Sequence, residues 1–256
     1  MNRNEGLTRA RLLRDAGVLG GALAVGGALG AGNALAELSV VAAGAAALSL
    51  TPEQEEGPYY VALEKIRREI TLGRPGVPLK LRMTIVDSAT GKPIRNAACD
   101  IWHCDASGVY SDESVEDTVG QTWLRGVQLT DARGVAAFDT IYPGHYVGRA
   151  THIHVKVHIG GTKTGTSYSG GHVSHTGQLM FDDAISTRVF ALPPYASDTD
   201  VRTLDSGDRV YTEQGGKRSV LKLTKLGTSV ADGYLGTITL SVDPAATPAV
   251  VGAAGP

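Results

Sequence analysis

The sequence predicts an all-β fold, in the form of a two-sheet β-sandwich with long loops and little helix. Short apolar segments recur along residues 79–242, and several of them alternate with polar residues. Such alternation places successive side chains on opposite faces of a strand. Turns rich in Gly and Asp separate the segments, and no long stretch has the periodicity of an amphipathic helix. Many short strands joined by such turns are typical of a sandwich.

The individual elements follow from this pattern in chain order. Thr51 to Glu55 could open a short helix, which Gly57-Pro58 would end. Residues 79–86 alternate most regularly and form the first predicted strand. Further strands are expected over 98–102, 135–142, 152–159, 177–181, 219–224 and 235–242. Residues 162–176 are rich in Gly, Ser, Thr and His and are predicted as a surface loop.

Composition and charge narrow the class of protein. The 256 residues include 24 Lys and Arg against 26 Asp and Glu, a net charge of −2, and 42% are hydrophobic. That hydrophobic share is enough for a core. The balanced charge argues against nucleic acid as a partner, because no basic excess would neutralise phosphates. Cys99 and Cys104 would lie about 17 Å apart on one strand, so two unbridged thiols are predicted.

The N-terminal region differs from the rest of the chain and predicts export. Four Arg precede a Gly/Ala-rich apolar run that ends near Ala34-Leu35-Ala36, as in a cleavable signal. The run is about 14 residues long, too short for a stable membrane span, although an amphipathic or anchoring helix is the alternative. Thr8 to Arg14 resembles a twin-arginine signal whose arginines are split by Ala10. The expected organisation is an export signal over 1–36, a linker over 37–56, the sandwich domain over 57–243 and a flexible tail over 244–256.

His152-Ile153-His154 is the strongest local signal of chemistry. On a strand, side chains two positions apart share a face, so the two imidazoles can reach one metal ion while Ile153 points to the opposite layer. Two polar residues on a solvated edge strand would show the same spacing. His158 shares the face but lies about 13 Å from His154, too far to bind the same ion.

A wider set of motifs resembles the intradiol ring-cleavage dioxygenases, the family of protocatechuate 3,4-dioxygenase and catechol 1,2-dioxygenase. The resemblance covers residues 57–182, about half of the chain. It lies in Gly57-Pro58-Tyr59-Tyr60, the stretches 73–79, 100–106, 108–110 and 140–146, Arg149 to His154, and 177–181. Val147-Gly148 stand where protocatechuate enzymes carry a Pro-Trp pair, so the substrate preference stays open.

The resemblance implies a mononuclear, non-haem Fe(III) site. By motif, Tyr110 and Tyr146 match the two Tyr ligands of the family, and His152 and His154 match the paired His ligands. Arg149 and Gln178 match active-site residues, and Tyr59 and Tyr60 match a segment at the pocket edge that contacts substrate.

The implied activity is intradiol cleavage of catechol-type diols with O₂, which gives muconate-type diacids. Phenolate oxygens are hard donors that suit ferric iron, and the displaced Tyr146 can accept a substrate proton. Arg149 is a permanent cation that can stabilise developing negative charge. Family members assemble through an N-terminal segment, so a homo-oligomer is compatible with this chain.

The remaining histidines and two other functions complete the expectations. His103 is expected to pack inside the fold, His145 to point away from Tyr146, and His172 and His175 to lie in a loop over the pocket. One alternative is a copper or zinc β-sandwich protein, although no Cys is placed as a blue-copper ligand and no zinc motif holds a carboxylate. A non-catalytic binding sandwich is the other, and no exposed aromatic row supports it.

Overall fold

The computed structural model describes residues 47–62 and 65–252. The export signal predicted over 1–36, the first part of the predicted linker and the last four residues of the predicted tail lie outside these ranges. Among the described residues, no helix is long and apolar enough to cross a membrane.

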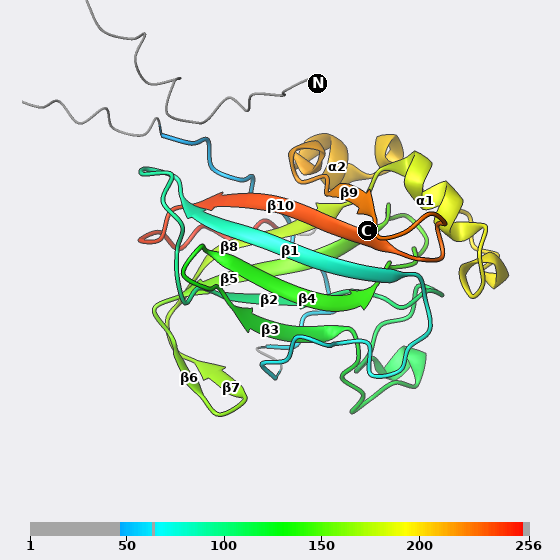
Figure 1. Ribbon diagram of the computed structural model, residues 1–256, viewed down its shortest axis with the longest axis horizontal. Helices are drawn as coiled ribbons and strands as arrows, with labels where there is room; N and C mark the ends of the chain where they lie inside the picture. Colours follow the sequence, from blue (N-terminus) through cyan, green and yellow to red (C-terminus); the bar gives the residue numbers. More distant parts are fainter. Residues whose placement is uncertain (1–46, 63–64, 253–256) are drawn as a thin grey trace, which may run out of the picture. The chain divides into compact units, whose positions relative to one another are not determined.

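Two four-stranded sheets form the domain and confirm the predicted β-sandwich (Figure 1). The first sheet has the order β4-β1-β10-β9, and the second has the order β3-β2-β5-β8. Strand β1 pairs with β10 in parallel, whereas the other neighbours in both sheets are antiparallel. The strands of the first sheet are β1 (Pro78–Asp87), β4 (Val135–Ile141), β9 (Lys222–Lys225) and β10 (Tyr234–Val242). Those of the second are β2 (Ala98–Trp102), β3 (Arg125–Leu129), β5 (His152–Ile159) and β8 (His172–Met180).

The core lies between the two sheets and follows from the alternation in the sequence. In β1, Leu79, Leu81, Met83 and Ile85 are buried while the residues between them are exposed or half-buried. Strand β5 contributes Ile153, Val155 and Val157 to the same cluster from the opposite sheet. Burying a side chain of this size contributes about 1.5–3 kcal/mol. The other face of β5 is also buried, although it carries the polar side chains of His152, His154, Lys156 and His158.

Helical segments occupy the stretch between β8 and β9, where the sequence predicted none. They are α1 (Asp183–Phe190) and α2 (Arg209–Glu213), at one end of the sandwich in Figure 1. Asp182 and Asp208 cap their N-termini by accepting hydrogen bonds from Ile185 N and Tyr211 N. Both helices are short, which explains why periodicity did not reveal them. Single 3₁₀ turns are η2 (Ser114–Glu116), η3 (Tyr195–Ser197), η4 (Asp205–Gly207) and η5 (Gly216–Arg218).

The surface loop predicted over 162–176 is wrong. This segment forms the hairpin of β6 (Thr162–Thr164) and β7 (Ser167–Ser169), and then the first half of β8. Its polar composition reflects a hairpin exposed on both faces except at Tyr168. Strand β3 was also not predicted, because its single buried aliphatic residue, Val127, gives no alternation.

Residues 51–56 are the end of the predicted linker, and Thr51 to Glu55 were expected to open a short helix; the segment forms no helix and lies against the domain. Thr51 N donates to Ser241 O, and Gln54 N donates to Thr176 O. Gln54 is fully buried and Glu55 nearly so. The helix does not form because these backbone groups hydrogen-bond to other segments rather than to one another. The segment therefore brings Glu55 to the outer face of the second sheet.

Candidate metal centre

The candidate site lies on the outer face of the second sheet, where β5 begins. His152 and His154 project there together, and Ile153 points into the core as predicted. The β5 register places His154 between Trp102 of β2 and Gln178 of β8. The His154 ring stacks on the Trp102 indole, with centroids 4.9 Å apart and an interplanar angle of 5°. This contact holds one imidazole in a single orientation.

The two imidazoles face each other through their Nε2 atoms, which lie 3.0 Å apart. His152 Nδ1 is 2.7 Å from the backbone oxygen of Ala150. A carbonyl only accepts, so Nδ1 carries the proton and Nε2 of the neutral ring presents a lone pair. Burial first, and then nearby Arg149, lowers the pKa of His152. Burial also lowers the pKa of His154, so both rings are neutral and available as ligands.

Two tyrosines complete the constellation from different loops. The Tyr146 hydroxyl lies 3.3 Å from His152 Nε2. The Tyr110 ring lies 5.8 Å from the Tyr146 ring and 6.2 Å from the His154 ring, measured between centroids. Burial is the first cause that raises the pKa of each phenol. Within 47–62 and 65–252, the buried Tyr110 hydroxyl makes no hydrogen bond.

These four side chains fit a bound metal cation. Neutral imidazole nitrogens lie beside the buried Tyr110 phenol and the half-buried Tyr146 phenol, and the Tyr110 hydroxyl lacks any hydrogen-bond partner among the described residues. Without a cation both phenols stay protonated, whereas a cation would favour their ionised form. Within the part of the chain that the structure describes, no three or more His, Cys, Asp or Glu side chains are grouped so that they could hold a metal ion. A metal here would therefore depend on tyrosine oxygens.

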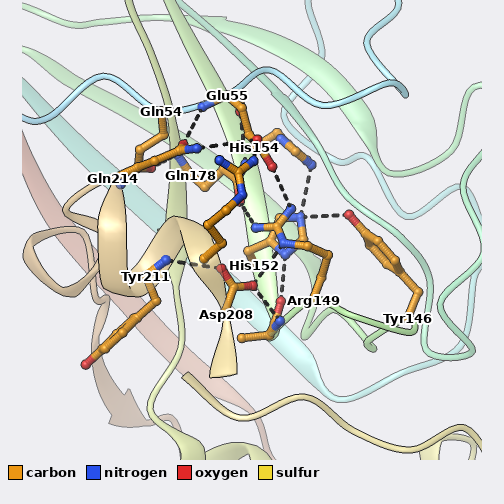
Figure 2. A network of polar contacts seen from close by, with 12 residues as sticks. Gln54, Glu55, Tyr146, Arg149, His152, His154, Gln178, Asp208, Tyr211 and Gln214 are labelled. Atoms are coloured by element: carbon orange, nitrogen blue, oxygen red, sulfur yellow. Dashed lines mark hydrogen bonds and ion pairs between the residues drawn. The ribbon is translucent and has the colours of Figure 1, made fainter. Parts of the chain in front are cut away.

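Arg149 and Gln178 lie together beside the histidines, as Figure 2 shows. Arg149 Nη2 donates to Gln178 Oε1, and Arg149 Nε donates to Asp208 Oδ2 at 2.9 Å. Gln178 Nε2 donates to the backbone oxygen of Glu55 at 2.9 Å. The predicted pair is therefore held by one segment that precedes the sandwich strands and by the N-cap of the short helix between β8 and β9.

Tyr59 and Tyr60 lie at this site but in different surroundings. Tyr59 stacks on Tyr110 with ring centroids 4.3 Å apart and meets the Tyr146 ring edge-on at 5.9 Å. Tyr60 instead packs on Trp102, and its hydroxyl donates to Asp100 Oδ2 at 3.1 Å. Tyr59 thus contacts the rings of Tyr110 and Tyr146, whereas Tyr60 contacts side chains of β2.

The loop position predicted for His172 and His175 is wrong. Both belong to β8, opposite Ile159 and Val157, at the far end of β5 from His152. His175 is buried, with Nδ1 2.6 Å from Glu53 Oε1. The error follows from ending the predicted loop at 176, since β8 continues back to residue 172.

His103 and His145 pack against residues outside the metal centre, and the two cysteines form no disulfide bond. His103 is fully buried between Cys104 O and Thr140 Oγ1, at 2.7 and 2.8 Å, which confirms the predicted packing. The His145 ring packs beside Phe190, 5.1 Å away between centroids. Cys99 and Cys104 are buried and unbridged, as predicted.

Three charged residues around the site were not predicted. Glu55 and Asp208 flank Arg149, and Arg125 donates to Tyr59 O, Ser111 O and Ser111 Oγ. Arg125 thereby ties the Tyr59 segment to the loop that carries Tyr110. Asp208 precedes a short helix, which a capping pattern could have suggested. Nothing in the sequence pattern connects any of the three with residues 146–154.

Comparison with known proteins shows which family the sequence of this chain is similar to. Residues 55–164 match the family model described as Dioxygenase. Catechol 1,2-dioxygenase from Acinetobacter baylyi is 35% identical over 101 residues, which cover 38% of this chain and 32% of that protein. The aligned segment thus spans about a third of that relative's length.

Solved structures extend the similarity over the domain. An intradiol ring-cleavage dioxygenase from Tetranychus urticae is 32% identical, with a TM-score of 0.69, covering 79% of this chain and 98% of that one. The dioxygenase domain of a carbohydrate-binding fusion protein from Streptomyces sp. SirexAA-E is 27% identical, with a TM-score of 0.54, covering 77% and 100%. The chain therefore belongs to the intradiol ring-cleavage dioxygenase family.

Proposed function

We propose that this protein holds a single non-haem Fe(III) ion and cleaves catechol-type aromatic diols with O₂ to muconate-type diacids. The observation that carries the proposal is the grouping of two neutral imidazoles with the buried Tyr110 phenol and the half-buried Tyr146 phenol. Family membership supports the reaction class. The ring bond between the two hydroxyl-bearing carbons breaks, and both atoms of one O₂ enter the product.

Tyr110, Tyr146, His152 and His154 would hold the iron. When bound, ferric iron would accept the two diol oxygens of the substrate and make the ring carbon reactive toward O₂. Two phenolate donors favour the ferric state and distinguish this set from the two-His-one-carboxylate set of Fe(II) oxygenases. The copper and zinc alternatives gain no support, because no carboxylate or thiol is placed with the two imidazoles to form a metal cluster among the described residues.

The protein's own groups would manage protons and charge around the substrate. Burial raises the pKa of Tyr146, so its phenolate would be a capable base that can take a proton from the second diol hydroxyl. Arg149 would stabilise negative charge that develops on the ring, and Gln178 would orient the guanidinium through its amide oxygen. The stacked Tyr59 ring would limit water access to the phenols.

The experiment is reconstitution of the purified protein with Fe(III) and assay with substituted catechols. We expect a red-brown tyrosinate-to-iron charge-transfer absorption, O₂ uptake, and a diacid product that contains both atoms of ¹⁸O₂. A panel of catechol, protocatechuate, hydroxyquinol and a lignin-derived catechol would identify the preferred diol. A colourless protein that binds stoichiometric iron would contradict the proposal.

We propose in addition that the protein is exported and that residues 1–36 are removed in the process. The basic start, the apolar run and the small residues at 34–36 support this. N-terminal sequencing of protein recovered from the cell envelope or the medium should begin near Glu37. A chain that keeps Met1 and stays in the cytoplasm would contradict it.

A further inference from the structure

Asp208 is a buried carboxylate that reaches the site from outside its sequence neighbourhood. It lies at the start of α2 and is fully buried. It is 54 residues after His154 and beyond residues 55–164, which match the family model. Figure 2 shows its carboxylate between α2 and the Arg149 side chain. A buried carboxylate is costly unless charge and hydrogen bonds compensate it, so its partners indicate why it is there.

The two oxygens of Asp208 have separate partners. Oδ1 accepts from Tyr211 N at 3.1 Å, which caps the short helix. Oδ2 accepts from Arg149 Nε at 2.9 Å and from Ala150 N at 2.7 Å. Oδ1 thus caps α2, whereas Oδ2 binds the segment that carries Arg149 and leads into β5.

The contacts of Oδ2 continue to the imidazole of His152. Ala150 donates its N–H to Asp208, and its carbonyl oxygen accepts a hydrogen bond from His152 Nδ1–H at 2.7 Å. That hydrogen bond fixes the tautomer of His152 and leaves Nε2 free to act as a ligand. Asp208 therefore restrains both the guanidinium of Arg149 and the backbone that orients a metal-binding ring.

We propose that Asp208 is a positioning residue of the active site, which aims Arg149 at the substrate and fixes the backbone that orients His152. The inference rests on the proposed function. Arg149 also lies 3.8 Å from Glu55 Oε1 and donates to Gln178. Asp208 provides the shorter charged contact to Arg149, because its Oδ2 is 2.9 Å from Arg149 Nε. Glu55 also contacts Arg209 and Gln214, so it is not devoted to Arg149.

A purely structural role as a helix cap is the competing explanation, and the chain offers a matched control. Asp182 caps α1 by accepting from Ile185 N at 2.9 Å. Within residues 47–62 and 65–252, the Asp182 side chain accepts no hydrogen bond from a residue of the site. Serine also caps helices well, so Asp208→Ser and Asp182→Ser each preserve a capping group. Only Asp208→Ser removes the acceptor for Arg149 and Ala150.

The test compares iron affinity and turnover in these variants of the full protein. We expect Asp208→Ser to hold iron about 10–100-fold more weakly than wild type in competition with a chelator, the effect typical of removing an outer partner of a metal ligand. Its kcat should fall by roughly 10²-fold through misplacement of Arg149, while KM changes far less. Asp208→Asn, which keeps one acceptor oxygen for Arg149 and Ala150, should recover part of both losses. Asp182→Ser should match wild type in both assays.

A double-mutant cycle with Arg149→Lys separates positioning from general destabilisation. If Asp208 acts through Arg149, the kcat losses of Asp208→Ser and Arg149→Lys will be less than multiplicative. Multiplicative losses, or iron affinity and kcat equal to wild type, would overturn the inference. If Asp208→Ser does not fold, Asp208→Asn takes its place, and failure of both to fold would assign Asp208 to the fold alone and overturn the inference. If wild type binds iron but opens no catechol, the proposed function fails, while the iron-affinity comparison still tests Asp208.

Discussion

Strand β5 carries two pairs of polar residues on the same outer face, and only one pair forms a candidate metal centre. His152 and His154 meet phenols and each other. Lys156 and His158, the next two on that face, meet carboxylates: Lys156 pairs with Glu56, and His158 Nε2 lies 4.0 Å from Asp100 Oδ2. The strand pattern is the same in both halves. The function of each half is therefore decided by the side chains that other segments bring opposite it.

The largest expected effect comes from breaking the first pair. His154→Ala should remove a metal ligand, so bound iron should fall below stoichiometric levels and kcat/KM on catechol should drop by more than about 10³-fold, roughly 4 kcal/mol. Iron content per chain and steady-state kinetics measure this. His158→Ala, on the same face of the same strand, should keep full iron content. Equal iron loss in both variants would remove the distinction between the two pairs.

The inner face of β5 should affect stability rather than iron binding. Ile153 is fully buried between the two imidazole positions, and Ile153→Ala should lower the free energy of unfolding by about 3 kcal/mol. Urea unfolding of the iron-free protein measures this, with Ile153→Val as a control that should cost about 1 kcal/mol. A folded Ile153→Ala protein that has lost its iron site would show that the two faces are not separable.

Tyr146→Phe tests the phenol that faces the first pair. We expect kcat to fall about 10²-fold, because the base for the second substrate proton is lost. The charge-transfer absorption should shift as well, since one tyrosinate donor is gone. Tyr168→Phe is the control, because the Tyr168 hydroxyl accepts from Gly161 N in the β6–β7 hairpin, away from the site. Unchanged turnover of Tyr146→Phe would refute the role assigned to it.

The smallest expected effect is the pH response of the second pair. Burial, and then nearby Lys156, lowers the pKa of His158 to about 4, against about 6.5 in an unfolded chain. As pH falls from about 6.5 toward 4, the unfolded chain takes up a proton that the folded chain does not, so stability is lost over that window. In His158→Asn the loss of unfolding free energy between pH 7 and pH 5 should be smaller by roughly 1–2 kcal/mol. Urea titrations at both pH values measure it, and identical losses would show that His158 does not contribute.

The sequence predicted most of what depends on local pattern. The strand with His152 and His154 and the regular strand at 79–86 rest on short stretches of residues. The four proposed ligands were expected from motifs that resemble a family, and their role stays a prediction. The segment at 51–56 and strand β3 escaped prediction because other parts of the chain determine their structure. Glu55 and Asp208 were missed for the same reason, since tertiary packing alone brings them to Arg149. The hairpin at 162–169 is local, and it was missed because its mostly exposed polar residues give no apolar alternation.

The parallel pairing of β1 with β10 has a consequence for how the protein can be made. All four proposed ligands precede residue 155, yet β10 lies between β1 and β9 in the first sheet and ends only at Val242. During translation, all four proposed ligand residues are therefore synthesised before the strand that completes the core. Sequence-distant pairings of this kind slow folding, so a fragment that stops after β5 should aggregate or remain unfolded rather than bind iron.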